Sequence, residues 1–326
     1  MRTGAAEAKL RASVEEMSGP WMGIDLGGTR VKVAFGMPRV PVIWSHEAPS
    51  RAERGRAHVE AALVEVSRAA LAQASVRGVC IEGLCIASPG IVDPVSGRIP
   101  AGTPNLPDWS ATDLPLLFGA ALGLPAVVEN DANTAAYAEA GWGAGQGAGN
   151  VLVVTVGTGV GGGAVVHGRL LRGSAGAGME LGHMAAPYVP GLIDGEAPTC
   201  SCGRSGCLEA HVGGWALRKQ WVVRLRELGP LSDAAEASVT LRGLLEQGQG
   251  GDTHAIALLR RAATCLGHGL RVAIQLLDPA VVVLGGGVVD GCPPWVGWVR
   301  KVLDATRVDA AGGNPKVRNA KFGNQA

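Results

Sequence analysis

The stretch from Glu180 to Glu209 constrains this chain most, because it gathers four side chains that bind soft metal ions. It reads E-L-G-H-M, then a segment rich in Pro and Gly, then C-S-C-G-R-S-G-C-L-E. Gly203 and Gly206 allow the cysteine-containing loop to fold back on itself. Thiolate and imidazole ligands in a closed tetrahedral site are typical of structural zinc. The sequence therefore predicts one zinc ion bound by His183, Cys200, Cys202 and Cys207.

Other interpretations of these residues remain open at this point. Two of the three thiols can form a disulfide and leave one free, or all three can be unrelated structural cysteines. His183 alone can be an ordinary core or surface histidine. Its assignment depends on Glu180, three residues earlier, which lies on the same face if this stretch is helical. The two carboxylates, Glu180 and Glu209, would then be held close to the cysteine-containing loop, Cys200–Cys207, which is called the metal loop below.

Composition limits the classes of function. The chain has 326 residues, a formal net charge of +1 and 47% apolar residues, so about two domains with large cores are expected. The near-neutral charge gives no electrostatic signature of nucleic-acid binding. No apolar run reaches the roughly 20 residues that a membrane span needs. Residues 1–20 carry three glutamates and no apolar core, which predicts a flexible segment rather than a signal peptide and a cytoplasmic location.

Two glycine-rich hairpins are predicted, at 21–35 and 150–166. In the first, a turn of Gly27, Gly28 and Thr29 offers peptide N–H groups and a hydroxyl to an anion, and Asp25 can hold Mg²⁺ through water. A plain hairpin turn explains the first motif about equally well. The second repeats the pattern and suggests two similar lobes that face a nucleotide. Its candidate ligands are Thr155, Gly157, Thr158 and Gly159.

Helices are expected at 57–74 and over most of 214–278, the last at 255–277, with strands at 79–86, 125–129 and 281–284. The glycines at 285–287 follow a buried strand and are a candidate adenosine contact, and Gly286 and Gly287 are the candidate ATP ligands among them. Asp131 begins a helix directly after a strand. It is either a helix cap or a catalytic base at the carboxyl end of that strand. Asn105 is a turn residue or a ligand contact.

Together these segments resemble the ROK family of sugar kinases and repressors, and the resemblance covers nearly all of the chain from Trp21 onward. Its motifs are D-L-G-G-T at 25–29, E-N-D-A-N at 129–133, T-V-G-T-G-V-G-G-G at 155–163, E-L-G-H at 180–183, C-S-C-G-R-S-G-C-L-E at 200–209 and L-G-G-G-V at 284–288. Each motif is modest alone, but their order and spacing are highly specific.

The resemblance implies an α/β, bilobal, actin-like ATPase fold with ribonuclease-H-like sheets and with ATP and sugar in the interlobe cleft. It implies a flexible segment at 1–20, an N-terminal lobe at 21–123 and a C-terminal lobe at 124–326. The implied reaction is ATP- and Mg²⁺-dependent phosphorylation of a hexose at its 6-hydroxyl, with glucose favoured. Asp131 would be the general base. The implied sugar ligands are Asn105, Asn130, Asp131, Glu180, His183 and Glu209, with His183 also binding zinc.

The sequence departs from the family pattern in three ways. Sixteen residues separate His183 from Cys200, more than is usual, and a surface loop is expected there. The chain ends in G-N-Q-A, where relatives continue into a closing helix, which leaves the packing there in question. Only twenty residues precede Trp21, too few for the DNA-binding domain of repressor members.

Alternative functions are kinases for N-acetylmannosamine or fructose and a sugar-sensing regulator, and polyphosphate is an alternative phosphoryl donor. A homodimer or homotetramer is expected.

Overall fold

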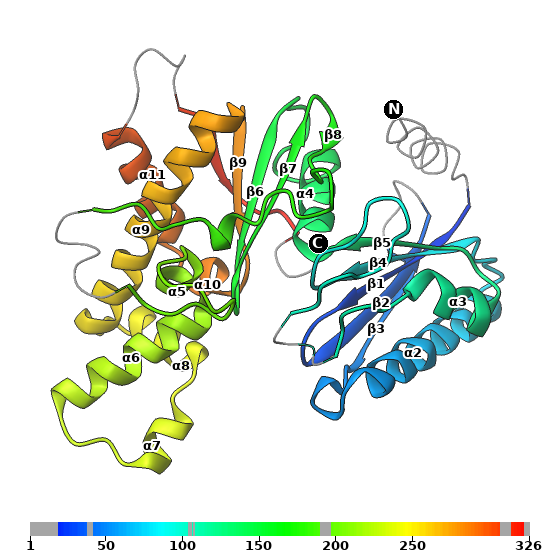
Figure 1. The fold of residues 1–326 in the computed structure, drawn as a ribbon, viewed down its shortest axis with the longest axis horizontal. Helices are drawn as coiled ribbons and strands as arrows, with labels where there is room; N and C mark the ends of the chain where they lie inside the picture. The colour runs from blue at the N-terminus through cyan, green and yellow to red at the C-terminus, as the bar shows by residue number, and fades with distance from the viewer. Residues whose placement is uncertain are drawn as a thin grey trace. The chain divides into compact units, whose positions relative to one another are not determined.

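The computed structural model describes residues 19–37, 42–103, 106, 108–189, 197–306 and 314–322. The chain divides into two compact units (Figure 1). The first is Met1–Asp131 with Arg172–Gly178, and the second is Ala132–Leu171 with Met179–Ala326. The first change of unit falls after Asp131, because the strand at 126–130 pairs with the sheet of the first unit.

The sheet of the first unit has the order β3-β2-β1-β4-β5. The expected hairpin is confirmed as β1 (Trp21–Leu26) and β2 (Arg30–Gly36), which are antiparallel, and β3 (Trp44–Pro49) continues the meander. β4 (Gly83–Ser88) and β5 (Ala126–Asn130) lie parallel to β1. β4 begins at Gly83, not at the expected 79, because its pairing partner β1 begins at Trp21, opposite Gly83.

One face of this sheet carries the core of the first unit. Alternate residues of β1 and β2 are buried, as the two-residue period of a strand requires. They pack together with α2 (Arg56–Val76), which contains the expected helix 57–74, and α3 (Leu114–Leu122). The one-turn η1 (Ala52–Arg54) precedes α2. This core is made by Met22, Ile24, Leu26, Val31, Val33, Phe35, Val59, Leu63, Leu84, Ile86 and Phe118, among others.

The second unit repeats the same sheet. β6 (Val151–Val156), β7 (Val160–Val166) and β8 (Arg169–Leu170) form an antiparallel meander, which confirms the second expected hairpin. β9 (Val281–Gly285) and β10 (Lys316–Asn319) extend it with parallel strands, and the order is β10-β9-β6-β7-β8. The order and strand directions match those of the first sheet, so the internal repeat suggested by the glycine motifs is present in the topology.

Both faces of the second sheet are covered (Figure 1). Val151 and Val153 pack with Ala136 of α4 (Asp131–Gly141). Leu152 and Val154 point the other way, into a larger core with α9 (Thr253–Leu277), α11 (Trp295–Ala305), α6 (Gly214–Leu228) and α8 (Leu241–Gln249). The shorter elements are η2 (Leu181–His183), α5 (Glu209–Val212), α7 (Asp233–Ser238) and α10 (Gly287–Asp290).

The last described residues, 314–322, extend the second sheet. β10 pairs with β9, and the Phe322 amide donates to Glu139 Oε1 at 2.9 Å. Glu139 is buried, and its Oε2 accepts from the Ala144 amide at 2.7 Å. Lys321 Nζ donates to the Trp142 carbonyl at 3.0 Å. The described residues 314–322 therefore add an edge strand to the second sheet and are tied to α4 through Glu139.

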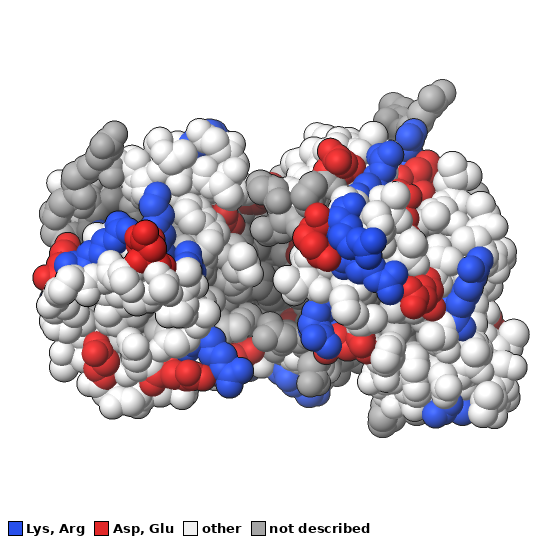
Figure 2. All heavy atoms as spheres, turned by 90° about the horizontal axis from the view of Figure 1, so that it is seen from below, with Lys and Arg blue, Asp and Glu red and all other residues white. Residues whose placement is uncertain are grey.

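The surface and the helices agree with the composition. On the face shown in Figure 2, acidic and basic side chains are interspersed, as the small net charge leads one to expect. Among the helices in the described ranges, none is both long enough and apolar enough to cross a membrane.

Candidate functional site

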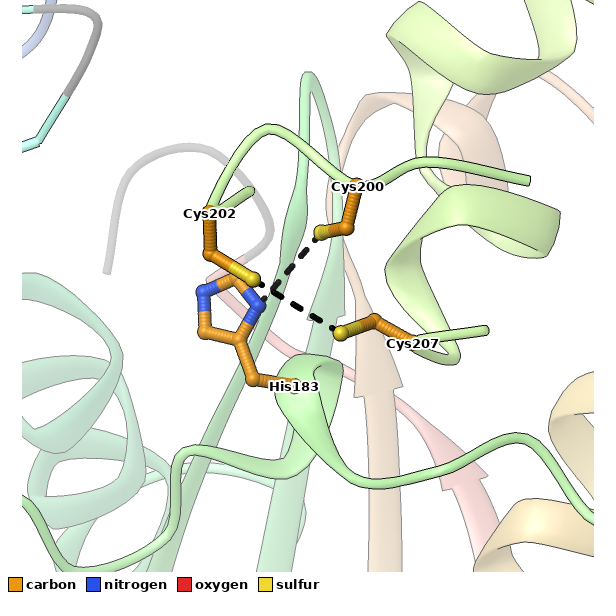
Figure 3. Close-up of side chains that lie close together, drawn as sticks. All are labelled: His183, Cys200, Cys202 and Cys207. Atoms are coloured by element: carbon orange, nitrogen blue, oxygen red, sulfur yellow. Dashed lines mark hydrogen bonds between the residues drawn. The ribbon is translucent and has the colours of Figure 1, made fainter. Parts of the chain in front are cut away.

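Four predicted metal ligands come together in the second unit (Figure 3). One donor atom from each of His183, Cys200, Cys202 and Cys207 lies within 4.8 Å of all the others. Cys200 Sγ is 3.7 Å from His183 Nδ1, and Cys202 Sγ is 3.7 Å from Cys207 Sγ. All seven cysteines are free. A disulfide needs an S–S distance of about 2.05 Å, so that alternative does not describe this structure.

The cluster has the dimensions of a zinc site. A tetrahedron with Zn–S bonds of about 2.3 Å has S···S edges of about 3.8 Å. The 3.7 Å distance between Cys202 Sγ and Cys207 Sγ is close to that edge length, and Cys200 Sγ lies equally near His183 Nδ1. The donor set of three thiols and one imidazole is also that of a closed structural zinc site. The residues present therefore fit a zinc ion, and the structure brings the four expected ligands together.

The backbone of the loop explains how the ligands meet. Gly203 and Gly206 have φ of 84° and 77°, in the left-handed region that favours glycine. The Cys200 amide donates to the Arg204 carbonyl, and short β-bridges join Thr199 to Ser205 and Ala185 to Cys207. The last bridge ties the loop to the residues after η2. Residues 190–196 of the long insert lie outside the described residues.

Electrostatics differ between the exposed and buried thiols. The backbone N–H of Arg204, and then its side chain, hydrogen-bond to Cys202 and lower the pKa of that thiol to about 6. Burial is the main cause that raises the pKa of Cys207 to about 12. A thiol must lose its proton to bind a metal ion. A bound cation would therefore have to lower the pKa of the buried Cys207 thiol more than that of Cys202.

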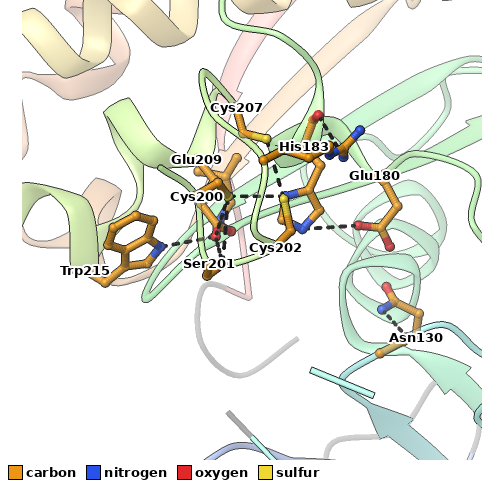
Figure 4. A network of polar contacts seen from close by, with 12 residues as sticks. Asn130, Glu180, His183, Cys200, Ser201, Cys202, Cys207, Glu209 and Trp215 are labelled. Atoms are coloured by element: carbon orange, nitrogen blue, oxygen red, sulfur yellow. Dashed lines mark hydrogen bonds and ion pairs between the residues drawn. The ribbon is translucent and has the colours of Figure 1, made fainter. Parts of the chain in front are cut away.

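His183 uses its two ring nitrogens in different directions. Nδ1 faces Cys200 Sγ, whereas Nε2 is 3.9 Å from Glu180 Oε2 (Figure 4). Glu180 precedes the 3₁₀ turn η2, so the pair lies on one face, as expected from its three-residue spacing. The Glu180 side chain is 45% exposed. His183 can therefore bind a metal with one nitrogen and a polar ligand, next to Glu180, with the other.

Glu209 is buried, with 7% of its surface exposed, and it bonds through both carboxylate oxygens (Figure 4). Oε2 accepts from the Val160 amide at 3.0 Å. Oε1 accepts from Ser201 Oγ at 2.8 Å and from Trp215 Nε1 at 3.1 Å. This carboxylate thus joins the metal loop, the start of α6 and the glycine hairpin.

The glycine turn of the second unit lies between Val156 and Val160 and includes Gly157, Thr158 and Gly159. Its carbonyls are held by α6, because Gly157 O accepts from the Gly214 amide at 2.9 Å and Thr158 O from the Trp215 amide at 3.1 Å. Thr158 is exposed.

Two positions beside this turn, Gly161 and Gly286, leave no room for a Cβ atom. A Cβ on Gly161 would lie 2.7 Å from Thr155 Oγ1. Gly286, before α10, has φ of 96°, and a Cβ there would lie 2.6 Å from the Val156 carbonyl oxygen. Gly287 then begins α10. The candidate nucleotide contacts in this unit are therefore brought to the same end of β6 and β9, which pair in parallel.

The first unit holds its own glycine turn in the same way. Ser50 hydrogen-bonds to two carbonyls of the turn. Its Oγ donates to Gly28 O at 3.0 Å and its amide donates to Thr29 O at 2.9 Å. The Gly27 amide donates to the Arg30 carbonyl. Asp25, at the end of β1, has Lys32 Nζ 3.7 Å from its Oδ2. Burial raises the pKa of Asp25, against the lowering effect of Lys32.

Asp131 begins α4 directly after β5 and is exposed. Its neighbour Asn130 donates from Nδ2 to the Gly90 carbonyl at 3.0 Å and from its amide to Glu129 Oε1 at 2.9 Å. Arg172 Nε contacts Glu129 Oε2 at 2.6 Å, and both side chains are about four-fifths buried. Asn105, the remaining expected sugar ligand, lies outside the described residues.

Three contributors had no signal in the sequence. Arg172, Ser201 and Trp215 bond to Glu129 or Glu209 from positions 43, 8 and 6 residues away. Trp215 follows the glycine pair 213–214, but nothing in that pair indicates a partner. These residues support motif carboxylates, and only the tertiary structure reveals them.

Several relatives of known sequence are bacterial glucokinases, and others are repressors and sugar kinases of other kinds. The chain is 30% identical to the glucokinase of Thermotoga maritima over 82% of this chain and 81% of that protein. It is 30% identical to the N-acetylmannosamine kinase of Yersinia pestis over 89% of each.

Two solved structures extend the likeness to the fold. The ROK hexokinase of Thermus thermophilus is 35% identical, with a TM-score of 0.73 and 93% of each chain covered. A ROK family glucokinase from Streptomyces griseus, in complex with glucose and AMPPNP, is 29% identical, with a TM-score of 0.77 and coverage of 94% of this chain and 95% of that one. The expected α/β class and actin-like ATPase fold are thereby confirmed.

The family comparison covers the whole region in which the motifs were found. The model of the ROK family matches residues 21–326. With the motif order, the repeated sheets and the metal cluster already described, this match shows that the chain belongs to the ROK family.

Proposed function

We propose that this protein is an ATP-dependent hexose 6-phosphotransferase and that its preferred sugar is glucose. The observation that carries the proposal is the Asn130–Asp131 pair, in which Asn130 ends β5 and Asp131 begins α4, in a chain related to glucokinases. Ligands of α/β sheets bind at the carboxyl ends of strands. An exposed carboxylate at that position can accept the proton of an attacking hydroxyl.

In this proposal, phosphoryl transfer depends on placement and charge neutralisation more than on covalent chemistry. The carbonyls of the two glycine turns accept hydrogen bonds, from Ser50 in one unit and from the amides of Gly214 and Trp215 in the other. Such turns can direct peptide N–H groups and the hydroxyls of Thr29 and Thr158 toward phosphates. Mg²⁺, held through water by Asp25, would offset charge on the transferred group. The remaining proposed nucleotide contacts are Gly27, Gly28, Thr155, Gly157, Gly159, Gly286 and Gly287.

Sugar recognition is proposed to use groups with hydrogen-bonding capacity at the proposed site. Glu180 and the Nε2 side of His183 form one such group, and Asn130 is another. Asn105, Asp131 and Glu209 complete the proposed set. A site that hydrogen-bonds a hydroxyl strongly rejects analogues that lack it. Zinc on His183 Nδ1 would fix the orientation of the ring and thus of Nε2.

N-acetylmannosamine is the second candidate substrate, because the N-acetylmannosamine kinase of Yersinia pestis is as similar in sequence as the Thermotoga glucokinase. Fructose and the role of a sugar-sensing regulator are the remaining alternatives, and polyphosphate is the alternative phosphoryl donor. Use of ATP implies a cytoplasmic location, and a homodimer or homotetramer is the proposed assembly.

A coupled assay of ADP release with glucose, fructose, mannose and N-acetylmannosamine tests the proposal. We expect the highest kcat/KM with glucose and no turnover with 6-deoxyglucose, which lacks the accepting hydroxyl. A higher kcat/KM for N-acetylmannosamine would assign the second candidate. Binding of sugar by calorimetry without turnover, with either ATP or polyphosphate, would indicate the regulator.

A further inference from the structure

The carboxylate of Glu209 is placed as a structural junction, not only as a group facing a ligand. Both of its oxygens accept bonds from the protein, and three different elements supply the donors. The metal loop donates through Ser201 and α6 through Trp215 (Figure 4), and β7 donates through the Val160 amide. Hydrogen bonds to an ionised carboxylate are about twice as strong as neutral ones. The junction can therefore hold the elements it joins.

The β7 donor places this junction directly beside the second glycine turn. Val160 is the first residue of β7 and follows Gly159. A Cβ on Gly159 would lie 2.4 Å from Glu209 Oε2, so the carboxylate reaches the Val160 amide because residue 159 is glycine. Trp215 holds the same turn a second time, because its own amide donates to Thr158 O.

The metal-loop donor connects the junction to the cysteine cluster. Ser201 lies between Cys200 and Cys202, and Glu209 follows Cys207 by two residues. Ser201 Oγ is 2.8 Å from Glu209 Oε1. A metal ion bound by the three thiols would fix the loop on both sides of Ser201 and thus the position of its hydroxyl. The loop's order is in this way transmitted to Glu209 and from there to the Val160 amide.

We infer that Glu209 is a positioning residue that couples the metal loop to the phosphate-binding turn, with Ser201 and Trp215 as its supports. The inference rests on the proposed role of the 157–160 turn in nucleotide binding. It predicts that disturbance of the loop weakens nucleotide binding even when no sugar is present. A carboxylate oxygen accepts about two bonds, so Oε2 keeps the capacity for one sugar hydroxyl, and the two roles are compatible.

The test uses two variants that leave Glu209 itself in place. Ser201→Ala removes the hydroxyl donor, and Trp215→Phe removes the indole N–H but keeps an aromatic ring. The full chain with its metal is titrated with Mg²⁺-AMPPNP by calorimetry in the absence of sugar. We expect the Kd to rise about three- to tenfold in each variant, which is less than the tenfold or more for full loss of one bond to a charged group, because the bond acts on the nucleotide only through the turn.

Matched controls separate this effect from general damage. Ser205→Ala changes another serine of the same loop. Trp298→Phe changes a Trp of α11 whose ring lies against the guanidinium of Arg260. Both are expected to leave the nucleotide Kd within twofold. Since Ser201 and Trp215 share Glu209 Oε1, the double variant should fall short of the product of the single effects.

Removal of the metal supplies an independent measurement. Chelated, metal-depleted protein that is still folded by circular dichroism should lose nucleotide affinity by at least as much as Ser201→Ala does. The inference is overturned if Ser201→Ala, Trp215→Phe and metal depletion leave the nucleotide Kd unchanged and raise only the KM for sugar. If no sugar is phosphorylated but nucleotide binding responds as described, the proposed reaction fails and the coupling stands.

Discussion

Asp131 and its neighbours show how one position can be a cap or a catalyst. The first turn of a helix favours a carboxylate in either role, so sequence alone leaves both open. In the structure Asp131 is exposed, whereas Glu129, two residues earlier, is held by Arg172 and by the Asn130 amide. Glu129 and Asn130, the two residues before Asp131, are thus fixed by tertiary contacts.

Asp131→Asn is predicted to lower kcat by roughly 10²–10⁴-fold, the usual contribution of a positioned base, while sugar still binds. The amide keeps the shape of the side chain but cannot accept the proton. Steady-state kinetics with calorimetric measurement of sugar binding checks both parts. Asp233→Asn, in the first turn of α7, is the matched control and should leave kcat unchanged. Near-normal turnover of the Asp131 variant would remove it from the role of base.

Asp25 gives a prediction about stability and pH. Its pKa is raised in the folded protein, mainly by burial. A carboxyl group whose folded pKa exceeds its unfolded pKa costs stability above that pKa, and the cost disappears as pH falls and the group is protonated. Asp25→Asn is therefore expected to raise Tm slightly at pH 7, and the difference should shrink toward pH 4.

The same variant separates stability from function, because Asp25 is also the proposed Mg²⁺ contact. The apparent Mg²⁺ requirement for turnover should increase in Asp25→Asn even though Tm does not fall. Thermal unfolding across pH 4–8 and Mg²⁺ titration of activity are the two measurements. A variant that is less stable at pH 7 than at pH 4, relative to the natural protein, would contradict the predicted direction of the pH dependence.

At the scale of elements, period and spacing predicted most of the strands and helices, and the exceptions have a tertiary cause. The apolar residues 79–81 continue the pattern of a strand, yet β4 begins only at Gly83, where β1 offers a partner. The boundaries of α9 followed a local signal instead, since Asp252 caps its first amides. The metal ligands were predictable because three of them lie within one short loop. Ser201 and Trp215 were not, because their shared partner is defined only by packing.

Gly286 is the element-scale position where backbone geometry decides most. Its φ of 96° is strained for other residues, and a Cβ would lie 2.6 Å from the Val156 carbonyl oxygen. Gly286→Ala is predicted to lower the free energy of unfolding by about 2 kcal/mol or more. Gly297→Ala is the control, since Gly297 lies in α11 with open space where a Cβ would stand, and it should gain about 0.5–1 kcal/mol. Urea unfolding measures both, and equal effects would contradict the argument.

At the scale of the whole molecule, the chain consists of two units with separate cores. Each unit is built on its own five-stranded sheet, and the two sheets have the same topology. The core around α2 belongs to the first unit, and those around α9 and α4 belong to the second. Chains of this kind need not unfold in one two-state transition. The metal cluster lies wholly within the second unit. Any stability that the metal provides should therefore act first on that unit.

We accordingly predict about one zinc per chain and a selective effect of its removal. Calorimetric scans of metal-loaded and chelated protein should show the transition of the second unit shifted down, by about 2–4 °C for each kcal/mol of binding energy lost. Cys202→Ser should reproduce the shift and the loss of zinc, because it removes one of four ligands. Cys80→Ser, an exposed cysteine of the first unit, should do neither. Unchanged scans after complete removal of zinc would show that the cluster does not stabilise the fold. A single transition that shifts as a whole would show that the two units unfold together.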